Sequence, residues 1–224
     1  MPSATGEPGA SEPMRAWKFL DVGRIAPFGG HVWPAPSGSA PGAWIRFPGR
    51  EVFACRIDDL PWWIAPELWE VELERPLRAL ETQVAAPAGR LLRRVTSWDE
   101  PALRAYGDAC AERARTLAVD ALEREGRAGD AESLRAPRSM LELCRAARAL
   151  AVDAAERTSS NLAGYAAESA MRAAEGVAAA SANITANAAI IASGDPAAFH
   201  RERTWQSRWI AERCGLAPLA ALAV

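Results

Sequence analysis

The chain has 224 residues, of which half are hydrophobic and about a quarter are charged, so a normal core is possible in one large domain or two modest ones. A net charge of −2 excludes a strongly basic surface, and we predict no nucleic-acid partner. The four cysteines, at positions 55, 110, 144 and 214, are far apart and form no Cys-x-x-Cys pair, which excludes a disulfide scaffold or a zinc site. Lys18 is the only lysine among 26 basic residues, and with the many alanines it indicates a GC-rich coding sequence.

The start of the chain predicts a disordered leader. Residues 1–13 consist mainly of Pro, Gly, Ser and Ala, without the apolar segment of a signal peptide. The most apolar later stretch, residues 177–192, is mostly alanine and contains Asn183, Thr185 and Asn187, so it is a poor membrane span. We therefore expect a cytoplasmic protein with buried free thiols and no membrane partner.

Residues 14–97 predict a β-rich module. Residues 68–74 alternate strictly, with Trp69, Val71 and Leu73 on one face and three glutamates on the other, which is typical of a half-buried strand. Further predicted strands cover residues 16–20, 43–47, 51–56, 77–85 and 90–95. Asp58 or Asp59 is expected to cap a short helical turn before the strand at residues 68–74.

Residues 98–217 predict helices, because the hydrophobic period changes to three or four residues. The first helix is capped by Ser97 or Asp99 and followed by a polar break at residues 126–137. The remaining predicted helices cover residues 139–157, 161–193 and, after Asp195-Pro196, a segment that ends at Gly215. Residues 218–224 are expected to be a weakly ordered tail.

The helix predicted at residues 161–193 carries a stripe made mostly of alanine. Alanine buries little apolar area, so such a stripe stabilises a fold only by packing along most of its length. Its neighbour would be an internal helix or the same helix of a second subunit, so we expect a protein partner or a homo-oligomer through residues 161–193. The predicted class is α+β: a small antiparallel Trp-rich sheet followed by an Ala-rich bundle of about four helices.

Nine tryptophans are many for this length, and seven lie between Trp17 and Trp98. Two interpretations stay open: the indoles build the core of a small β module, or some of them line a pocket or an interface. Adjacent residues on a turn rarely face one core, so Trp62 and Trp63 are the best binding candidates. Trp33, which lies in a loop rich in Gly and Pro, is the third.

Glu70 and Glu72 are the main catalytic candidates. They project from one face of a strand and are either an acid/base pair or part of a solvated face. The Glu-Val-Glu triplet resembles the Glu-x-Glu of ADP-ribosyltransferases, although no Ser-Thr-Ser strand accompanies it. His31, beside Gly29 and Gly30, is the third candidate. We predict no metal site and no cofactor, since the nucleotide-binding and hydrolase motifs do not occur.

Several segments together resemble an uncharacterised bacterial family associated with actinobacteria. They are Trp17-Lys18-Phe19-Leu20, Pro27-Phe28-Gly29-Gly30, Trp33-Pro34, Asp59-Leu60-Pro61-Trp62-Trp63, Glu67-Leu68-Trp69-Glu70-Val71-Glu72-Leu73 and Trp205-Gln206-Ser207-Arg208-Trp209-Ile210. That family typically shows Gly-x-His-Ala-Cys before the Asp-Leu-Pro element, whereas Val52-Phe53-Ala54-Cys55 here lacks the histidine. The resemblance implies a shared fold unit and no activity.

Two functional hypotheses follow. The first is a non-enzymatic interaction or structural protein that uses a Trp-rich face and the long Ala-rich helix as contact surfaces. The second is a transferase or hydrolase with Glu70, Glu72 and His31 around a tryptophan-lined cleft. The two differ geometrically, because the enzyme requires the carboxylates and the imidazole in one cleft.

Overall fold

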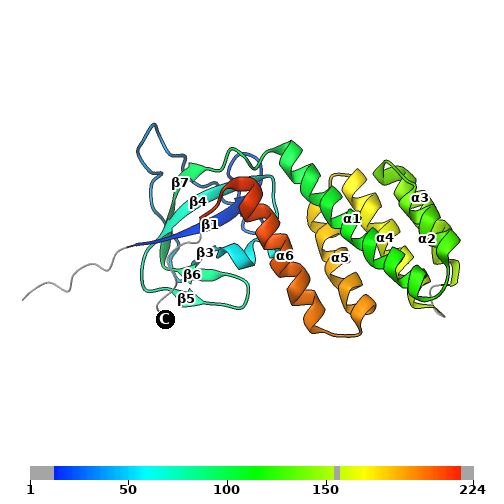
Figure 1. The fold of residues 1–224 in the computed structure, drawn as a ribbon. Helices are drawn as coiled ribbons and strands as arrows, with labels where there is room; N and C mark the ends of the chain where they lie inside the picture. Colours follow the sequence, from blue (N-terminus) through cyan, green and yellow to red (C-terminus); the bar gives the residue numbers. More distant parts are fainter. Residues whose placement is uncertain (1–12, 154–156, 218–224) are drawn as a thin grey trace, which may run out of the picture.

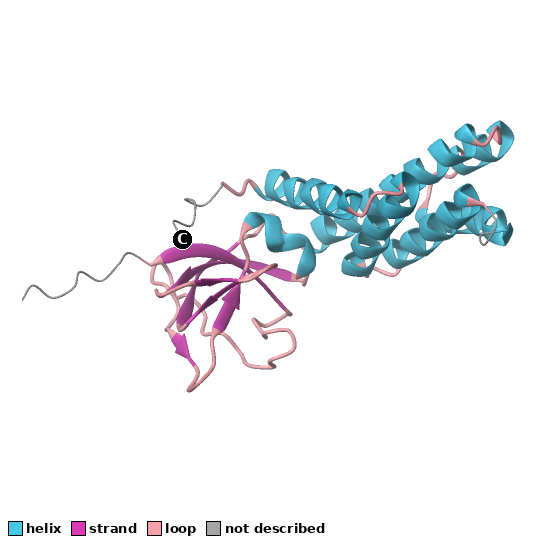
Figure 2. Cartoon of the chain, turned by 90° about the horizontal axis from the view of Figure 1, so that it is seen from below, coloured by secondary structure: helices cyan, strands magenta, loops and turns pink. Residues whose placement is uncertain are grey.

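The computed structural model describes residues 13–153 and 157–217, so the predicted leader (except Pro13) and the tail lie outside the described residues. The predicted class is confirmed: antiparallel sheets at the N-terminal end are followed by a helical bundle. The β module lies at one end of the molecule, and the helices extend away from it (Figures 1 and 2).

The β module contains two antiparallel sheets. The first has the order β1 (Met14–Leu20), β4 (Glu67–Leu73), β7 (Ala88–Arg94) and β2 (Ile45–Arg46), and the second β3 (Val52–Ala54), β6 (Val84–Ala86) and β5 (Arg78–Ala79). A backbone bridge between Trp17 and Cys55 joins them. The strand predicted at residues 77–85 is therefore wrong in extent, because a turn between Leu80 and Gln83 splits it into β5 and β6.

Both faces of β4 are covered, which corrects the expectation of a solvated glutamate face. Trp69, Val71 and Leu73 pack in a cluster that both sheets share, whereas Leu68 packs in a second cluster toward the helices. The strand alternation is as predicted, but Glu70 is only 3% exposed. The central position of β4, between β1 and β7, explains this burial.

One short helix lies before β4, and the other helices follow β7. They are η1 (Ile57–Trp62), α1 (Glu100–Arg124), α2 (Ala128–Arg135), α3 (Met140–Leu150), η2 (Ala151–Asp153), α4 (Thr158–Ala174), α5 (Ala178–Ser193) and α6 (Ala197–Cys214). The predicted cap of α1 is Asp99, which accepts from the Ala102 amide, and α3 is capped by Ser139, which accepts from the Glu142 amide. The predicted break at 126–137 is wrong, because α2 forms within it.

The single helix predicted at residues 161–193 is also wrong, because the chain forms α4 and α5 instead. Gly176 has a φ of +76°. Its amide donates to the Ala173 carbonyl, and the Val177 amide donates to the Arg172 carbonyl at 2.8 Å. These two bonds are those of a Schellman motif, which ends an α-helix with a left-handed glycine. The break also rotates the buried face of α5, so that Val177 is exposed and Ala178 is buried.

The alanine faces of α4 and α5 pack against each other and against α1 within the chain. Ser169 of α4 hydrogen-bonds to Ser181 and Thr185 of α5, and these two residues donate to carbonyls of α1. The neighbour expected for the alanine stripe is therefore internal. An assembly of subunits through residues 161–193 stays a prediction.

A second cluster joins the β module to the helices. Phe19 of β1 packs edge-on against Trp98 at 5.4 Å between ring centroids, and Trp98 contacts Tyr106 of α1. The same cluster includes Ile210 of α6. None of the helices in the described part of the chain is long and apolar enough to cross a membrane.

Candidate functional site: a cavity around Lys18

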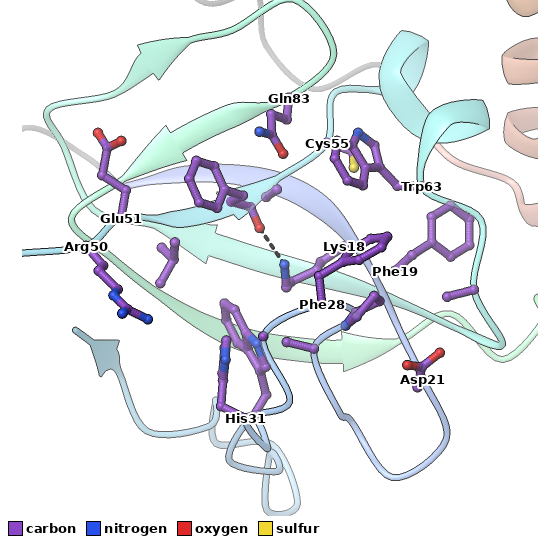
Figure 3. A pocket seen from close by; sticks show the side chains of 18 of the residues that line it. Lys18, Phe19, Asp21, Phe28, His31, Arg50, Glu51, Cys55, Trp63 and Gln83 are labelled. Atoms are coloured by element: carbon purple, nitrogen blue, oxygen red, sulfur yellow. Dashed lines mark hydrogen bonds between the residues drawn. The ribbon is translucent and has the colours of Figure 1, made fainter.

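The candidate site is a cavity of about 600 Å³ in the β module (Figure 3). Its walls come from β1, the loop at residues 26–33, residues 47–55 with β3, and the segment that follows η1. The lining side chains are largely apolar and aromatic, and they include Lys18, Phe28, His31, Trp33, Phe47, Arg50, Cys55 and Trp63. A cavity of this size, with few polar groups on apolar walls, is typical of small-molecule sites.

Lys18 supplies the amine of this cavity. By strand alternation its side chain shares the face of Ala16 and Leu20, both fully buried. The Lys18 amine donates a 2.6 Å hydrogen bond to the Phe53 carbonyl, which Figure 3 shows as a dashed line, and lies 5.1 Å from the Trp33 ring centroid. Among the described residues, Lys18 forms no ion pair.

The surroundings of Lys18 disfavour its charged form. Burial lowers the pKa of Lys18 from 10.5 to about 8, and a partial attraction to Cys55 opposes this shift. The carbonyl bond and the indole face stabilise the ammonium, but no carboxylate of the described residues forms an ion pair with it. A substantial fraction of Lys18 is therefore a neutral amine near pH 8.

His31 lines the same cavity as the Lys18 amine. Burial, with repulsion from Lys18, lowers the pKa of His31, whereas a hydrogen bond to the Gly29 backbone raises it. The ring packs edge-on against Phe47 at 4.5 Å between centroids. His31 is thus neutral at pH 7, with Nδ1 on the side of Gly29.

Two ring nitrogens of the cavity-lining residues are buried and have no hydrogen-bond partner among the described residues: Nε2 of His31 and Nε1 of Trp33. An unsatisfied buried polar atom costs about 1–3 kcal/mol. Trp33 is 1% exposed, so its nitrogen is well shielded from bulk solvent. Neither nitrogen is exposed to the open space of the cavity, so both stay unsatisfied within the protein.

The rim of the cavity carries one aromatic and one cationic side chain. Phe28 is 97% exposed and has a φ of +65°, a conformation that costs a bulky residue energy. Arg50 is exposed and forms no ion pair within the described part of the chain. Figure 3 shows Arg50 and Phe28 at different places around Lys18. An apolar body and an anionic group could both be held here.

Cys55 is a wall residue and not a nucleophile. Its side chain is 4% exposed, and burial raises the pKa of Cys55 to about 12, despite the nearby charge of Lys18. A thiolate is the reactive form of cysteine, so this thiol is inert at neutral pH.

The three predicted binding tryptophans have different surroundings. Trp33 and Trp63 line the cavity, and the Trp63 indole donates to the Thr82 carbonyl at 2.7 Å. Trp62 instead packs against α6, where it stacks on Arg203 at 4.6 Å and on Phe199 at 5.5 Å between centroids. The adjacent indoles therefore serve two surfaces, as their turn position suggested.

The predicted carboxylates lie away from this cavity. Glu70 bonds to Arg15 at 3.0 Å and to Arg93 at 2.6 Å, and Glu72 bonds to Arg90 at 2.6 Å. By strand alternation the two glutamates project from the sheet face opposite to that of Lys18, and neither lines the cavity. The structure does not bring Glu70 and Glu72 together with His31.

A metal centre has no support in the described residues. Over residues 13–153 and 157–217, no three His, Cys, Asp or Glu side chains lie close enough together to hold a metal ion.

No family model, curated protein or solved structure matches the chain. The site is therefore interpreted from its own residues.

The sequence predictions missed Lys18, the central group of the site. A signal was present, because Lys18 stands in the run Trp17-Lys18-Phe19-Leu20, where both strand faces are apolar. A lysine on an apolar strand face points into an interior or a pocket. Arg50 and Phe28 gave no such signal, since a turn residue and an exposed loop residue are unremarkable in sequence.

Proposed function

We propose that the β module binds a small, largely apolar organic molecule that carries an anionic group. The observation that supports this most is the position of the only lysine, without a carboxylate partner, inside an aromatic cavity. Isolated charges are rarely buried unless they are paired. A ligand anion would supply the missing charge to Lys18.

The other cavity groups agree with such a ligand. Arg50, exposed at the rim, adds a second unpaired cation, and Phe28, Phe47 and Trp63 add apolar surface. The molecule would lie with its apolar body against the rings and its anion near Lys18.

This is a non-enzymatic binding function, but it uses a cavity for a small molecule, whereas the sequence predicted contact surfaces for a protein partner. The acid/base alternative with Glu70 and Glu72 has no geometric support, because arginines bind both carboxylates on another face. The role of the alanine-rich helices as contact surfaces has little support either, since their alanine faces pack internally.

Two naphthalene dyes test the proposal. 1-Anilinonaphthalene-8-sulfonate carries a sulfonate on an aromatic body, and N-phenyl-1-naphthylamine is the same body without the charge. We expect the sulfonate dye to bind the folded protein at one saturable site, measured by its fluorescence. Lys18→Met should weaken this binding about tenfold, because a charge-assisted contact is lost.

The neutral dye is the control, and its affinity should change little in Lys18→Met, since methionine retains the apolar stem. Arg104→Met, an exposed arginine of α1 far along the chain from the cavity, should leave both dyes unaffected. The proposal fails if the sulfonate dye does not bind the folded protein, or if Lys18→Met leaves its affinity unchanged.

A further inference from the structure

The cavity offers a chemistry beyond simple binding. Lys18 holds a primary amine in a largely apolar cavity, where its hydrogen-bond acceptor among the described residues is a backbone carbonyl. A backbone carbonyl accepts one N–H and takes no proton from the amine. The amine nitrogen therefore becomes a free nucleophile when it loses its proton, because no carboxylate retains the charge.

We propose that Lys18 forms a reversible imine with an aldehyde or ketone that enters the cavity. This inference rests on the proposed function, because it needs the same cavity to admit an apolar organic molecule. It adds the carbonyl group as the reacting part of that molecule.

The reaction balances without a redox partner. The neutral Lys18 nitrogen attacks the carbonyl carbon, a C–N bond forms, and one proton moves from nitrogen to oxygen to give a carbinolamine. The C–O bond then breaks, and the oxygen leaves as water with a second proton. Overall, a lysine ammonium and a carbonyl compound give a protonated imine and one water, and hydrolysis reverses the step.

The surroundings favour this equilibrium. Burial lowers the pKa of Lys18 to about 8, so far more neutral amine is present at pH 7 than for an exposed lysine. His31 lines the same cavity and is close enough to Lys18 for the two groups to repel each other when charged, which also favours the neutral amine. The Trp33 ring lies 5.1 Å from the nitrogen and would stabilise the cationic imine.

Reductive trapping tests the inference cleanly, because Lys18 is the only lysine. The full chain is incubated at pH 7 with 1-naphthaldehyde and sodium cyanoborohydride, and the adduct is located by peptide mass spectrometry. The α-amino terminus serves as the internal reference. We expect Lys18 in the folded protein to be labelled at least about tenfold faster than Lys18 in urea, relative to that reference.

Excess sulfonate dye should slow labelling of Lys18 but not of the terminus, and Lys18→Arg should leave only the terminal adduct. Labelling of Lys18 no faster in the folded protein than in urea would overturn the inference. If that result came with tight, Lys18-dependent dye binding, the proposed binding function would stand and only the imine chemistry would be refuted. If the dye did not bind at all, the binding function itself would fail.

Discussion

At the scale of single residues, the partly shielded amine of Lys18 lowers the stability of the folded protein when it is charged. Lys18 keeps its charge at neutral pH although its surroundings lower the pKa to about 8. The ammonium is retained at a cost in stability, and the indole of Trp33 and the carbonyl of Phe53 offset only part of it. Such a cost is typical of a group kept for its function.

This cost predicts how stability changes with pH. Between pH 8 and pH 10.5 the unfolded chain binds a proton at Lys18 that the folded chain has lost, so the free energy of unfolding should rise with pH. The shift corresponds to a gain on the order of 2–3 kcal/mol at most, since Lys18 is only partly shielded. The other titratable or charged groups of the cavity are Asp21, His31, Arg50, Glu51 and Cys55.

Urea unfolding of the wild type and of Lys18→Met at pH 7 and pH 9.5 measures this effect. Lys18→Met should be more stable than the wild type at pH 7, and the difference should shrink at pH 9.5. Equal pH profiles for the two proteins would show that Lys18 is not desolvated in the native state.

At the scale of elements, glycines determine where the helices end. Gly176 has left-handed backbone geometry, and a Cβ added there meets no atom within 4 Å. Gly176→Ala should therefore destabilise the protein by about 1 kcal/mol through backbone strain alone. Gly129, inside α2 and equally free of neighbours, is the matched control: Gly129→Ala should stabilise by about 0.4–1 kcal/mol.

Thermal unfolding of the two variants separates the effects, because their expected signs are opposite. If Gly176→Ala were neutral or stabilising, residues 158–193 could form the continuous helix that the alanine stripe predicts. The observed break between α4 and α5 would then be contradicted.

At the same scale, the sequence predicts regular periodicity well and tertiary rearrangements poorly. The change of period near Ser97, the Asp99 cap and the alternation of β4 follow from local patterns, and all are confirmed. The helix end at Gly176 was missed because a single glycine within an alanine-rich helical pattern is usually tolerated. The burial of Glu70 was missed because it depends on arginines from β1 and β7.

The cavity lay beyond sequence reasoning for a related reason. Its walls come from segments between residues 18 and 83, and antiparallel pairing with distant strands places them together. His31, Trp33 and Trp63 could be proposed individually from loop position and indole chemistry. Their common position around Lys18 could not, because no local pattern encodes which strands pair.

At the scale of the whole molecule, Arg203 of α6 links the helices to the β module. It lies in the protein interior between the Trp62 and Phe199 rings and donates hydrogen bonds to the Pro61 carbonyl, Asn183 and Gln206. Burial lowers the pKa of Arg203, and no carboxylate of the described residues forms an ion pair with it to oppose this shift. These contacts predict that the β module and the helices unfold together.

Arg203→Leu should lower the free energy of unfolding by about 2–4 kcal/mol, because it leaves buried acceptors unpaired. Arg208→Leu, at an exposed position of the same helix, should change it by less than about 0.5 kcal/mol. Far-UV circular dichroism and tryptophan fluorescence should give coincident transitions in the wild type and both variants. A shift of one signal without the other would show that the two parts unfold separately.

The state of the Lys18 amine tests the central claim most directly. Protein labelled with ¹⁵Nζ-lysine gives one side-chain signal, since the chain has one lysine. We predict that this signal titrates with a midpoint near pH 8 and shifts on addition of 1-anilinonaphthalene-8-sulfonate, saturating together with the dye fluorescence. A midpoint near 10.5 and a signal unaffected by saturating dye would contradict the account.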